Sequence, residues 1–166
     1  MENQKGISTV LAIIIIIVAI IAFFSPWFYL KYEVVLVKRK IIEETNVQRK
    51  TNGLPALSEN ATLDEVAKSK AYDMFRNQYF DHVSPTGVGP EELAESLGYN
   101  YSFQGENLLM GNFISEKAMV QDWMNSPGHR ANILNSHYTE IGVSVVKEKY
   151  KGKTVWIGVQ EFGSPR

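Results

Sequence analysis

The sequence predicts an α+β domain, in which helices cover an antiparallel sheet, preceded by one hydrophobic N-terminal segment. Three observations carry this prediction: an uncharged apolar stretch at residues 7–30, apolar residues at helical spacing through the middle of the chain, and alternating apolar residues near the C-terminus. Helices that come first and strands that come last are typical of α+β folds. A chain of 166 residues is long enough for one ordinary domain and a short appendage.

Charge and composition exclude several classes of protein. The chain has 17 Lys and Arg against 18 Asp and Glu, which gives a formal net charge of -1. It therefore has no net basic field that would indicate binding to nucleic acid. It also has no cysteine, which excludes disulfides and cysteine-based zinc sites but leaves the cellular compartment open.

The N-terminal apolar stretch predicts a transmembrane helix at residues 7–30. Its centre, from Val10 to Phe24, is unbroken aliphatic and aromatic side chain, and three aromatic residues at 27–29 resemble an interfacial belt. A cleaved signal peptide is the alternative, but the apolar run is longer than a usual signal core and no A-x-A-like cleavage site follows. We expect a retained single-pass anchor, with residues 1–6 as a short flank and residues 31–35 as a linker or helix continuation.

Orientation and processing of this segment stay open. Lys31 and Lys38 to Lys40 follow it, whereas Lys5 alone precedes it, so the positive-inside rule by itself would place the domain in the cytoplasm. Long domains translocate largely regardless of such charges, and charge alone does not decide the orientation. Lys5-Gly6 before residues 7–10 resembles the cleavage region of type IV prepilins, so a pilin-like assembly subunit processed after Gly6 is one alternative.

Two long helices are expected first in the domain. Apolar residues at helical spacing indicate a helix over residues 32–51, which Asn52-Gly53 would end. Thr62 followed by Glu65 matches a capping box and predicts the start of a second helix. Apolar residues spaced along its buried face carry this second helix to about residue 79.

Shorter elements follow. Gly89-Pro90 starts a short helix that Gly98 ends, and Ser115 caps another helix. Alternating apolar residues at 141–145 and 155–159 predict two strands joined by a turn within residues 147–153. Strand signals before residue 100 are poor.

The stretch Ser126-Pro127-Gly128 interrupts a helical pattern. Ser126 suits an N-cap and Pro127 suits the first position of a new helix, so one helix stops and another starts here. His129 then lies in the first turn of the new helix, where the helix dipole favours a neutral imidazole that can accept a hydrogen bond or bind a metal. The alternative is a plain turn with a surface histidine.

Two further histidines and one glutamate are candidate site residues. His82 follows the second helix in a Ser-Pro turn, and His137 comes just before the first strong strand. Glu106 lies in a short segment rich in glycine and amide residues, where its structural role would be to accept backbone N–H bonds and hold a loop. The spacings fit no local zinc motif such as H-E-x-x-H.

Five motifs occur in the order found in the bacterial branch of the SCP-domain, or CAP, superfamily, which includes cysteine-rich secretory and plant pathogenesis-related proteins. They are YFDHVSPTG, GENLL, WMNSPGHRANILN, YTEIGV and VWIGVQEFG. The resemblance covers about residues 36–163, essentially the whole chain outside the predicted anchor. It implies an α-β-α sandwich.

The resemblance also implies a cleft. Eukaryotic members line it with two histidines and two glutamates, and some bind zinc there. By motif, His82, Glu106 and His137 match three of these positions, whereas Ser126 stands at the second glutamate. His129 belongs to the Ser-Pro-Gly-His-Arg of bacterial relatives and is the expected substitute. The resulting candidates are a cleft of His82, Glu106, His129 and His137, zinc as a cofactor of His82, His129 and Glu106, and support from Asn107, Arg130 and Ser126.

We therefore expect a membrane-anchored extracytoplasmic SCP-domain protein that acts as a binding module at the cell envelope. No cysteine is available as a nucleophile, and no serine lies in a G-x-S-x-G elbow. Expected partners are the bilayer, through the N-terminal helix, and a cell-wall polymer, lipid or peptide; nucleic acid is not expected. The alternative is a zinc-dependent, peptidase-like hydrolase in which Glu106 is a ligand or the general base.

Overall fold

Residues 37–166 are described in the computed structural model. The predicted transmembrane helix, its flank, the linker and the cleavage point after Gly6 all lie outside the described residues. Across residues 37–166, no helix is both long and apolar enough to span a bilayer.

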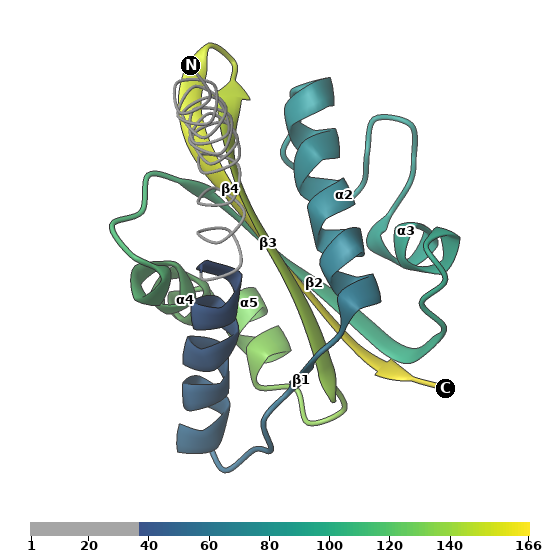
Figure 1. Ribbon diagram of the computed structural model, residues 1–166, viewed down its shortest axis with the longest axis vertical. Helices are drawn as coiled ribbons and strands as arrows, with labels where there is room; N and C mark the ends of the chain where they lie inside the picture. Colours follow the sequence, from purple (N-terminus) through teal and green to yellow (C-terminus); the bar gives the residue numbers. More distant parts are fainter. Residues whose placement is uncertain (1–36) are drawn as a thin grey trace, which may run out of the picture. The chain divides into compact units, whose positions relative to one another are not determined.

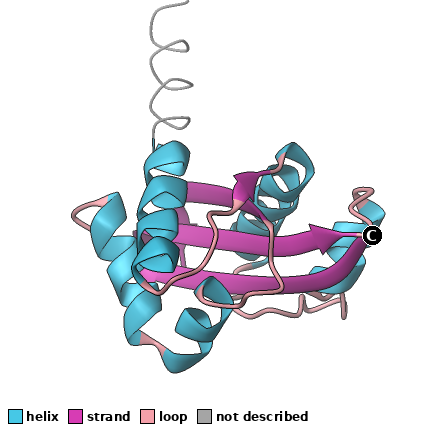
Figure 2. Ribbon diagram, turned by 90° about the horizontal axis from the view of Figure 1, so that it is seen from below, coloured by secondary structure: helices cyan, strands magenta, loops and turns pink. Residues whose placement is uncertain are grey.

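A four-stranded sheet with the order β1-β3-β4-β2 forms the centre of the fold. The strands are β1 (Ser58–Glu59), β2 (Tyr101–Gly111), β3 (Glu140–Tyr150) and β4 (Lys153–Pro165). The three long strands lie side by side in Figure 2. β3 and β4 form the predicted antiparallel hairpin, β2 pairs antiparallel with the other side of β4, and the short β1 runs parallel to β3.

Helices cover both faces of this sheet (Figure 1). One layer holds α2 (Ala61–Asn77) and α3 (Pro90–Ser96), and the other holds the helix at residues 37–51, α4 (Glu116–Asn125) and α5 (Pro127–Ile133). This is the layered arrangement of helices, sheet and helices that the sequence predicted. The helix ends near Thr51 and Gly98 and the caps at Ser115 and Ser126 are also as predicted.

The alternation of side chains along the strands separates two hydrophobic cores. Ile157 and Val159 of β4 pack with Leu108 of β2 against Ala71 and Met74 of α2. A second cluster lies on the opposite face of the sheet, under α4, α5 and the helix at residues 37–51. Its members include Trp123, Ile133, Tyr138, Ile141, Val143 and Phe162.

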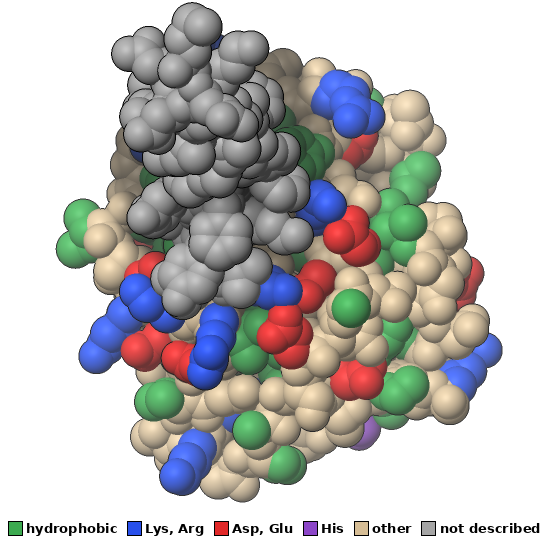
Figure 3. All heavy atoms as spheres, in the orientation of Figure 1, with side chains coloured by type: hydrophobic (Ala, Val, Ile, Leu, Met, Phe, Trp, Pro, Cys, Tyr) green, Lys and Arg blue, Asp and Glu red, His purple; other side chains and the backbone are tan. Residues whose placement is uncertain are grey.

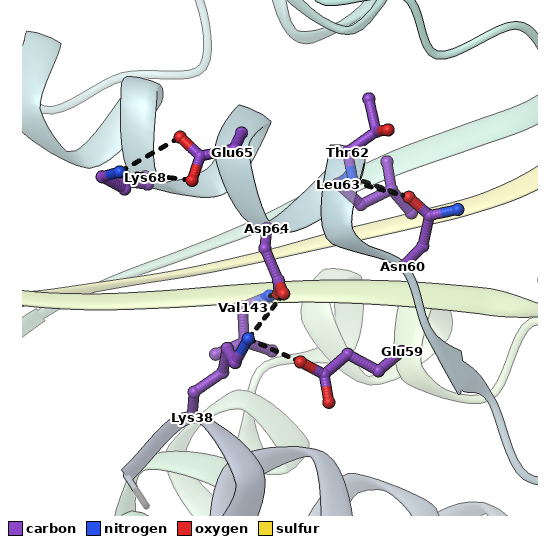
Figure 4. A network of polar contacts seen from close by, with 9 residues as sticks. All are labelled: Lys38, Glu59, Asn60, Thr62, Leu63, Asp64, Glu65, Lys68 and Val143. Atoms are coloured by element: carbon purple, nitrogen blue, oxygen red, sulfur yellow. Dashed lines mark hydrogen bonds and ion pairs between the residues drawn. The ribbon is translucent and has the colours of Figure 1, made fainter. Parts of the chain in front are cut away.

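The start of α2 differs from the prediction, because Asn60 and not Thr62 is the N-cap (Figure 4). Asn60 Oδ1 accepts hydrogen bonds from the backbone N–H groups of Thr62, at 2.9 Å, and Leu63, at 3.1 Å. Its Nδ2 donates to Glu140 Oε2 at 3.0 Å, which fixes the side chain in the capping position. The far end of α2 lies at Asn77, two residues before the expected end.

α2 is fastened to both neighbouring elements near its start (Figure 4). Asp64 accepts a hydrogen bond from the Val143 backbone N–H at 2.9 Å and pairs with Lys38 Nζ at 2.6 Å. At this crossing, a Cβ on Gly142 would lie 2.1 Å from the Leu63 backbone carbon. Glycine is therefore required at residue 142 for α2 to lie this close to β3.

The sequence did not predict β1 or β2. Glu106 lies within β2 and not in the loop that its structural role, one of the two considered, required. The strand carries polar residues on both faces, and two neighbouring ones stand opposite polar residues of β4. Glu106 faces Glu161 and Asn107 faces Gln160. This pairing removes the apolar-polar alternation that identifies a strand in sequence.

The exposed surface carries both signs of charge. Figure 3 shows acidic and basic side chains interspersed over the face that it draws, with histidine only at the edge of the view. This mixture agrees with the formal net charge of -1.

Candidate functional site

A buried lysine holds the loop that carries His82. Lys70 of α2 is only 2% exposed, and its Nζ donates hydrogen bonds to the His82 carbonyl oxygen at 2.6 Å and to the Tyr79 hydroxyl at 3.2 Å. The Tyr79 hydroxyl in turn donates to Asp73 Oδ2 at 2.6 Å. Burial lowers the pKa of Lys70, while nearby carboxylates act in the opposite direction. The backbone of His82 is therefore fixed from α2.

The His82 side chain contacts Glu106. His82 Nδ1 lies 2.6 Å from Glu106 Oε1, with the His82 side chain half exposed and the Glu106 side chain 1% exposed. The hydrogen bond to Glu106 raises the pKa of His82, and burial opposes it. An ionised Glu106 beside a protonated His82 is a charge-assisted pair, which is stronger than a neutral hydrogen bond.

Glu161 completes this group from β4. It lies directly opposite Glu106 in the strand register, is fully buried, and accepts a hydrogen bond from Gln104 Nε2 at Oε2, 2.9 Å away. Its remaining oxygen, Oε1, and Glu106 Oε2 are both buried and have no other hydrogen-bond partner. Burial, followed by the neighbouring Glu106, raises the pKa of the Glu161 carboxyl well above its usual range.

A proton on Glu161 accounts for both unpartnered oxygens. Two carboxylates that share a buried site cannot both ionise without a large cost in free energy. Protonation of Glu161 at Oε1 would supply a donor for Glu106 Oε2, which belongs to the residue directly opposite in the register and has no other donor. The chain of contacts then runs from Gln104 through Glu161 and Glu106 to His82.

Two asparagines fasten α5 to β2. Asn107 Nδ2 donates to the His129 carbonyl oxygen at 3.0 Å and to Gln160 Oε1 at 3.1 Å. Asn132 Nδ2 donates to the Glu106 carbonyl oxygen at 3.0 Å and to Asn107 Oδ1 at 2.9 Å. The Asn107 side chain thus links β2, beside Glu106, to the backbone of α5 at His129.

His129 is the third residue of α5, and its carbonyl oxygen accepts a hydrogen bond from Asn107, the neighbour of Glu106 in β2. Burial lowers the pKa of His129, and the positive charge of His82 lowers it further. Its Nδ1 is buried and has no hydrogen-bond partner. The other predicted supports contribute less: Ser126 caps α5 without a side-chain hydrogen bond, and Arg130 is exposed.

His137 has other neighbours. Buried Arg49 donates to the carbonyl oxygens of Asn135, at 2.8 Å, and Tyr138, at 3.2 Å, and so fixes the turn between them. His137 is exposed on this turn, with its ring centroid 4.4 Å from that of Phe103 and its Nδ1 3.0 Å from Asn135 Oδ1. The structure therefore places His82 against Glu106 and joins the His129 backbone to Asn107, whereas the contacts of His137 are to Phe103 and Asn135.

The donor arrangement does not fit a metal centre built from three or more protein ligands. Within residues 37–166, no group of three or more His, Cys, Asp or Glu side chains is placed to hold a metal ion. His82 Nδ1 is already engaged by Glu106. We therefore derive no chemical step through zinc.

The domain surface has two hollows. One of about 520 Å³ adjoins the loop after α2 and has a polar lining that includes Lys68, Lys70, Asp73, Arg76, Tyr79 and Ser84. The other, of about 180 Å³, is mainly apolar and is lined in part by Val37, Ile114 and Trp156. Neither hollow is lined by His82, Glu106, His129 or His137.

Sequence reasoning missed Glu161 and Lys70, although each carried a signal. Glu161 continues the inward-facing alternation of Ile157 and Val159, so a carboxylate stands where an apolar residue is expected. Lys70 lies among the apolar positions of the α2 stripe. A charged residue in phase with a hydrophobic stripe is buried and needs a partner.

The fold and the site together define a domain with the CAP architecture, a mixed four-stranded sheet between helical layers, in which a histidine from the loop after α2 contacts a glutamate of β2. Residues 42–162 match the family described as the cysteine-rich secretory protein family, CAP. The chain belongs to this family, and the predicted family is confirmed.

Bacterial relatives carry the same domain. The chain is 43% identical over 110 residues to Bacillus subtilis YkwD, covering 66% of this chain and 42% of that protein. It is 36% identical over 113 residues to the Bacillus subtilis membrane protein YlbC, covering 68% and 32%. The chain thus spans less than half of the length of these two relatives.

Solved structures agree with the fold. An extracellular SCP-domain protein of Bacillus anthracis superposes with a TM-score of 0.67 and 30% identity, covering 76% of this chain and 40% of that one. An outer surface protein of Borrelia burgdorferi gives a TM-score of 0.66 and 26% identity, covering 77% and 92%. These similar proteins are thus extracellular or surface proteins.

Proposed function

We propose that this chain is a membrane-anchored, extracytoplasmic CAP-domain protein that binds a polar ligand at the cell envelope. The apolar segment at residues 7–30 supports the anchor. The extracellular and surface relatives support the compartment, and the one relative named a membrane protein agrees with an anchor in this family.

One observation carries the binding role: a half-exposed His82 is held on a buried acid pair, next to a polar hollow. Glu106 fixes the imidazole and Lys70 fixes its backbone, so little side-chain entropy is lost when a ligand contacts His82. Lys70 also lines the hollow of about 520 Å³. Charged and hydroxyl groups in this lining suit a cell-wall polymer better than an acyl chain.

Sedimentation with purified cell-wall material tests this function. The full chain, held in detergent micelles, should bind saturably, and both His82→Ala and Arg76→Ala should weaken binding several-fold. Arg39→Ala is the control, because Arg39 is also exposed but lies in the helix at residues 37–51, in the opposite layer. Equal binding by all variants, or no saturable binding to any envelope fraction, would refute the proposal.

The zinc-dependent hydrolase stays the alternative that the family resemblance implies. The unpartnered His129 Nδ1 favours it, whereas the absence of a three-donor group among residues 37–166 does not. Elemental mass spectrometry of the purified full chain separates the two. Stoichiometric zinc in the native chain that is absent from both His82→Ala and His129→Ala would favour the metal-dependent hydrolase over the binding module.

A further inference from the structure

The end of the sheet where β3 turns into β4 carries an unusual combination of side chains. We call it the hairpin-end surface, and it consists of Phe113, Ile114, Trp156, Lys147, Lys149, Lys151 and Lys153. The strand register brings its parts together, because Trp156 of β4 pairs with Gly111 on one side and with Lys147 on the other. The segment after Gly111 then supplies Phe113 and Ile114.

The apolar part of this surface is open to solvent. Ile114 is 97% exposed. It borders the hollow of about 180 Å³, whose lining also includes Phe113, Met119 and Trp156. A single exposed apolar residue is common in soluble proteins, but one beside an open apolar hollow and a partly exposed tryptophan indicates a contact surface.

The basic part adjoins the apolar part along the hairpin. All four lysines are exposed, and with Glu148 the hairpin carries four positive charges and one negative charge, a net charge of three. Lys147 Nζ lies 4.9 Å from the centroid of the Trp156 ring. Lysines on an open strand edge can guard against aggregation, but that role does not explain why Ile114 is left in water beside them.

The path of the chain indicates what covers this surface. Val37, the first described residue, lines the same hollow as Ile114 and Trp156. The segment predicted to cross the bilayer ends at Leu30, seven residues earlier. Seven residues span at most about 25 Å even when fully extended, so the hairpin-end surface lies close to the point where the chain would leave the membrane.

We propose that the hairpin-end surface rests on the anionic bilayer in which the chain is anchored. Ile114 and Trp156 insert among the headgroups, where apolar and indole side chains are favoured, and the four lysines contact lipid phosphates. Such a contact would fix the orientation of the domain and turn the opposite end of the sheet away from the membrane. This inference rests on the proposed membrane anchor.

A fluorescent label near Ile114 tests the contact, because the chain has no cysteine of its own. An environment-sensitive dye is attached to Asn112→Cys, which leaves Ile114 in place, in the full chain reconstituted into nanodiscs. With phosphatidylglycerol present, its emission should shift to the blue, and spin-labelled lipid should quench it several-fold more than the same dye at Asn52→Cys. Asn52 is the control because it is exposed and follows the far end of the helix at residues 37–51.

Further variants separate the possible outcomes. Quenching should fall when Ile114→Ser is added, when Lys149, Lys151 and Lys153 are all changed to Gln, and when phosphatidylcholine is the only lipid. Flotation with vesicles in alkaline carbonate tests the anchor itself. If the chain floats but the dyes at Asn112→Cys and Asn52→Cys are quenched equally, the docking is overturned and the anchor stands. A chain that does not float overturns the anchor and the docking together. A blue shift with purified teichoic acid, without quenching by lipid, assigns the surface to a wall polymer and overturns the lipid proposal.

Discussion

Replacing Glu161 with glutamine should make the protein more stable at neutral pH and reduce the dependence of its stability on pH. Glu161 is fully buried opposite Glu106, and burial raises the pKa of its carboxyl well above the ordinary value of 4.5. The native state therefore keeps a proton that the unfolded chain releases above about pH 4.5. Stability from such a group is fully present below that pH and is lost as the pH rises toward the folded-state pKa.

The size of the effect follows from this one proton. The free energy of unfolding should fall by at most about 1.4 kcal/mol for each pH unit, or roughly 2.7 kcal/mol between about pH 5 and about pH 7. In Glu161→Gln the amide Nε2 can donate to Glu106 Oε2 and the amide oxygen can accept from Gln104. The variant keeps both contacts without a proton to lose, so this part of the slope should disappear.

Urea unfolding of the full chain in micelles, followed by tryptophan emission across this pH range, measures the slope. Glu148→Gln makes the same substitution at an exposed position on β3 and is the matched control. His82, whose pKa is raised by Glu106, adds a further loss of stability above about pH 6.5, so the comparison is cleanest below that pH. Equal slopes for the native chain and Glu161→Gln would refute the shared proton.

Three further substitutions test the framework of the site. Lys70→Met removes both hydrogen bonds from its ammonium group, so the free energy of unfolding should fall by about 1–3 kcal/mol and hydrogen exchange in the His82 loop should accelerate. Asn132→Ala leaves the Glu106 carbonyl oxygen without its side-chain donor and should cost about 1–2 kcal/mol in a urea titration. Gly142→Ala places a methyl group against the Leu63 backbone and should cost at least about 3 kcal/mol, measured by thermal unfolding.

Each of these has a matched control in the same chain. Lys68→Met and Asn125→Ala change exposed residues of α2 and α4 and should leave stability nearly unchanged. Gly128→Ala adds a methyl group where nothing lies within 4 Å. If a control variant loses as much stability as its partner, the assigned contact is not the cause.

Much of the fold was readable from local patterns. The stop and restart of helix at Ser126-Pro127 depends on capping and on the geometry of proline, which act within a few residues. The β3–β4 hairpin was predicted for a similar reason, because alternating apolar residues at 141–145 and 155–159 mark the two strands and a glycine-containing turn lies between them. The order of five motifs then identified the family.

What sequence did not reveal depends on partners far along the chain. β2 lacks a clear alternation because Glu106 and Asn107 are each paired with a polar residue of β4. The cap at Asn60 is held by Glu140, which lies on another element. Local propensity favoured Thr62 at this position, but the tertiary contact decided the start of the helix.

The candidate site was predicted only in part, because some of its residues depend on partners far along the chain. Motifs pointed to His82, Glu106 and His129. The structure places His82 against Glu106 and fastens the His129 backbone to Asn107. Glu161 and Lys70 were missed, because their roles come from burial against Glu106 and the His82 backbone, respectively, and not from any local pattern. His137 was grouped with the others by motif, whereas its turn is held by Arg49 beside Phe103.

The measurement that tests the central claim most directly is a proton titration of His82 by NMR, with histidine labelled isotopically in the full chain. The chain has three histidines, so each signal can be assigned by substitution. If Glu106 holds the imidazole as described, the pKa of His82 lies above 6.5 in the native chain and falls in Glu106→Gln, while the pKa of His129 lies below 6.5. A His82 pKa at or below 6.5 that does not respond to Glu106→Gln would contradict the account.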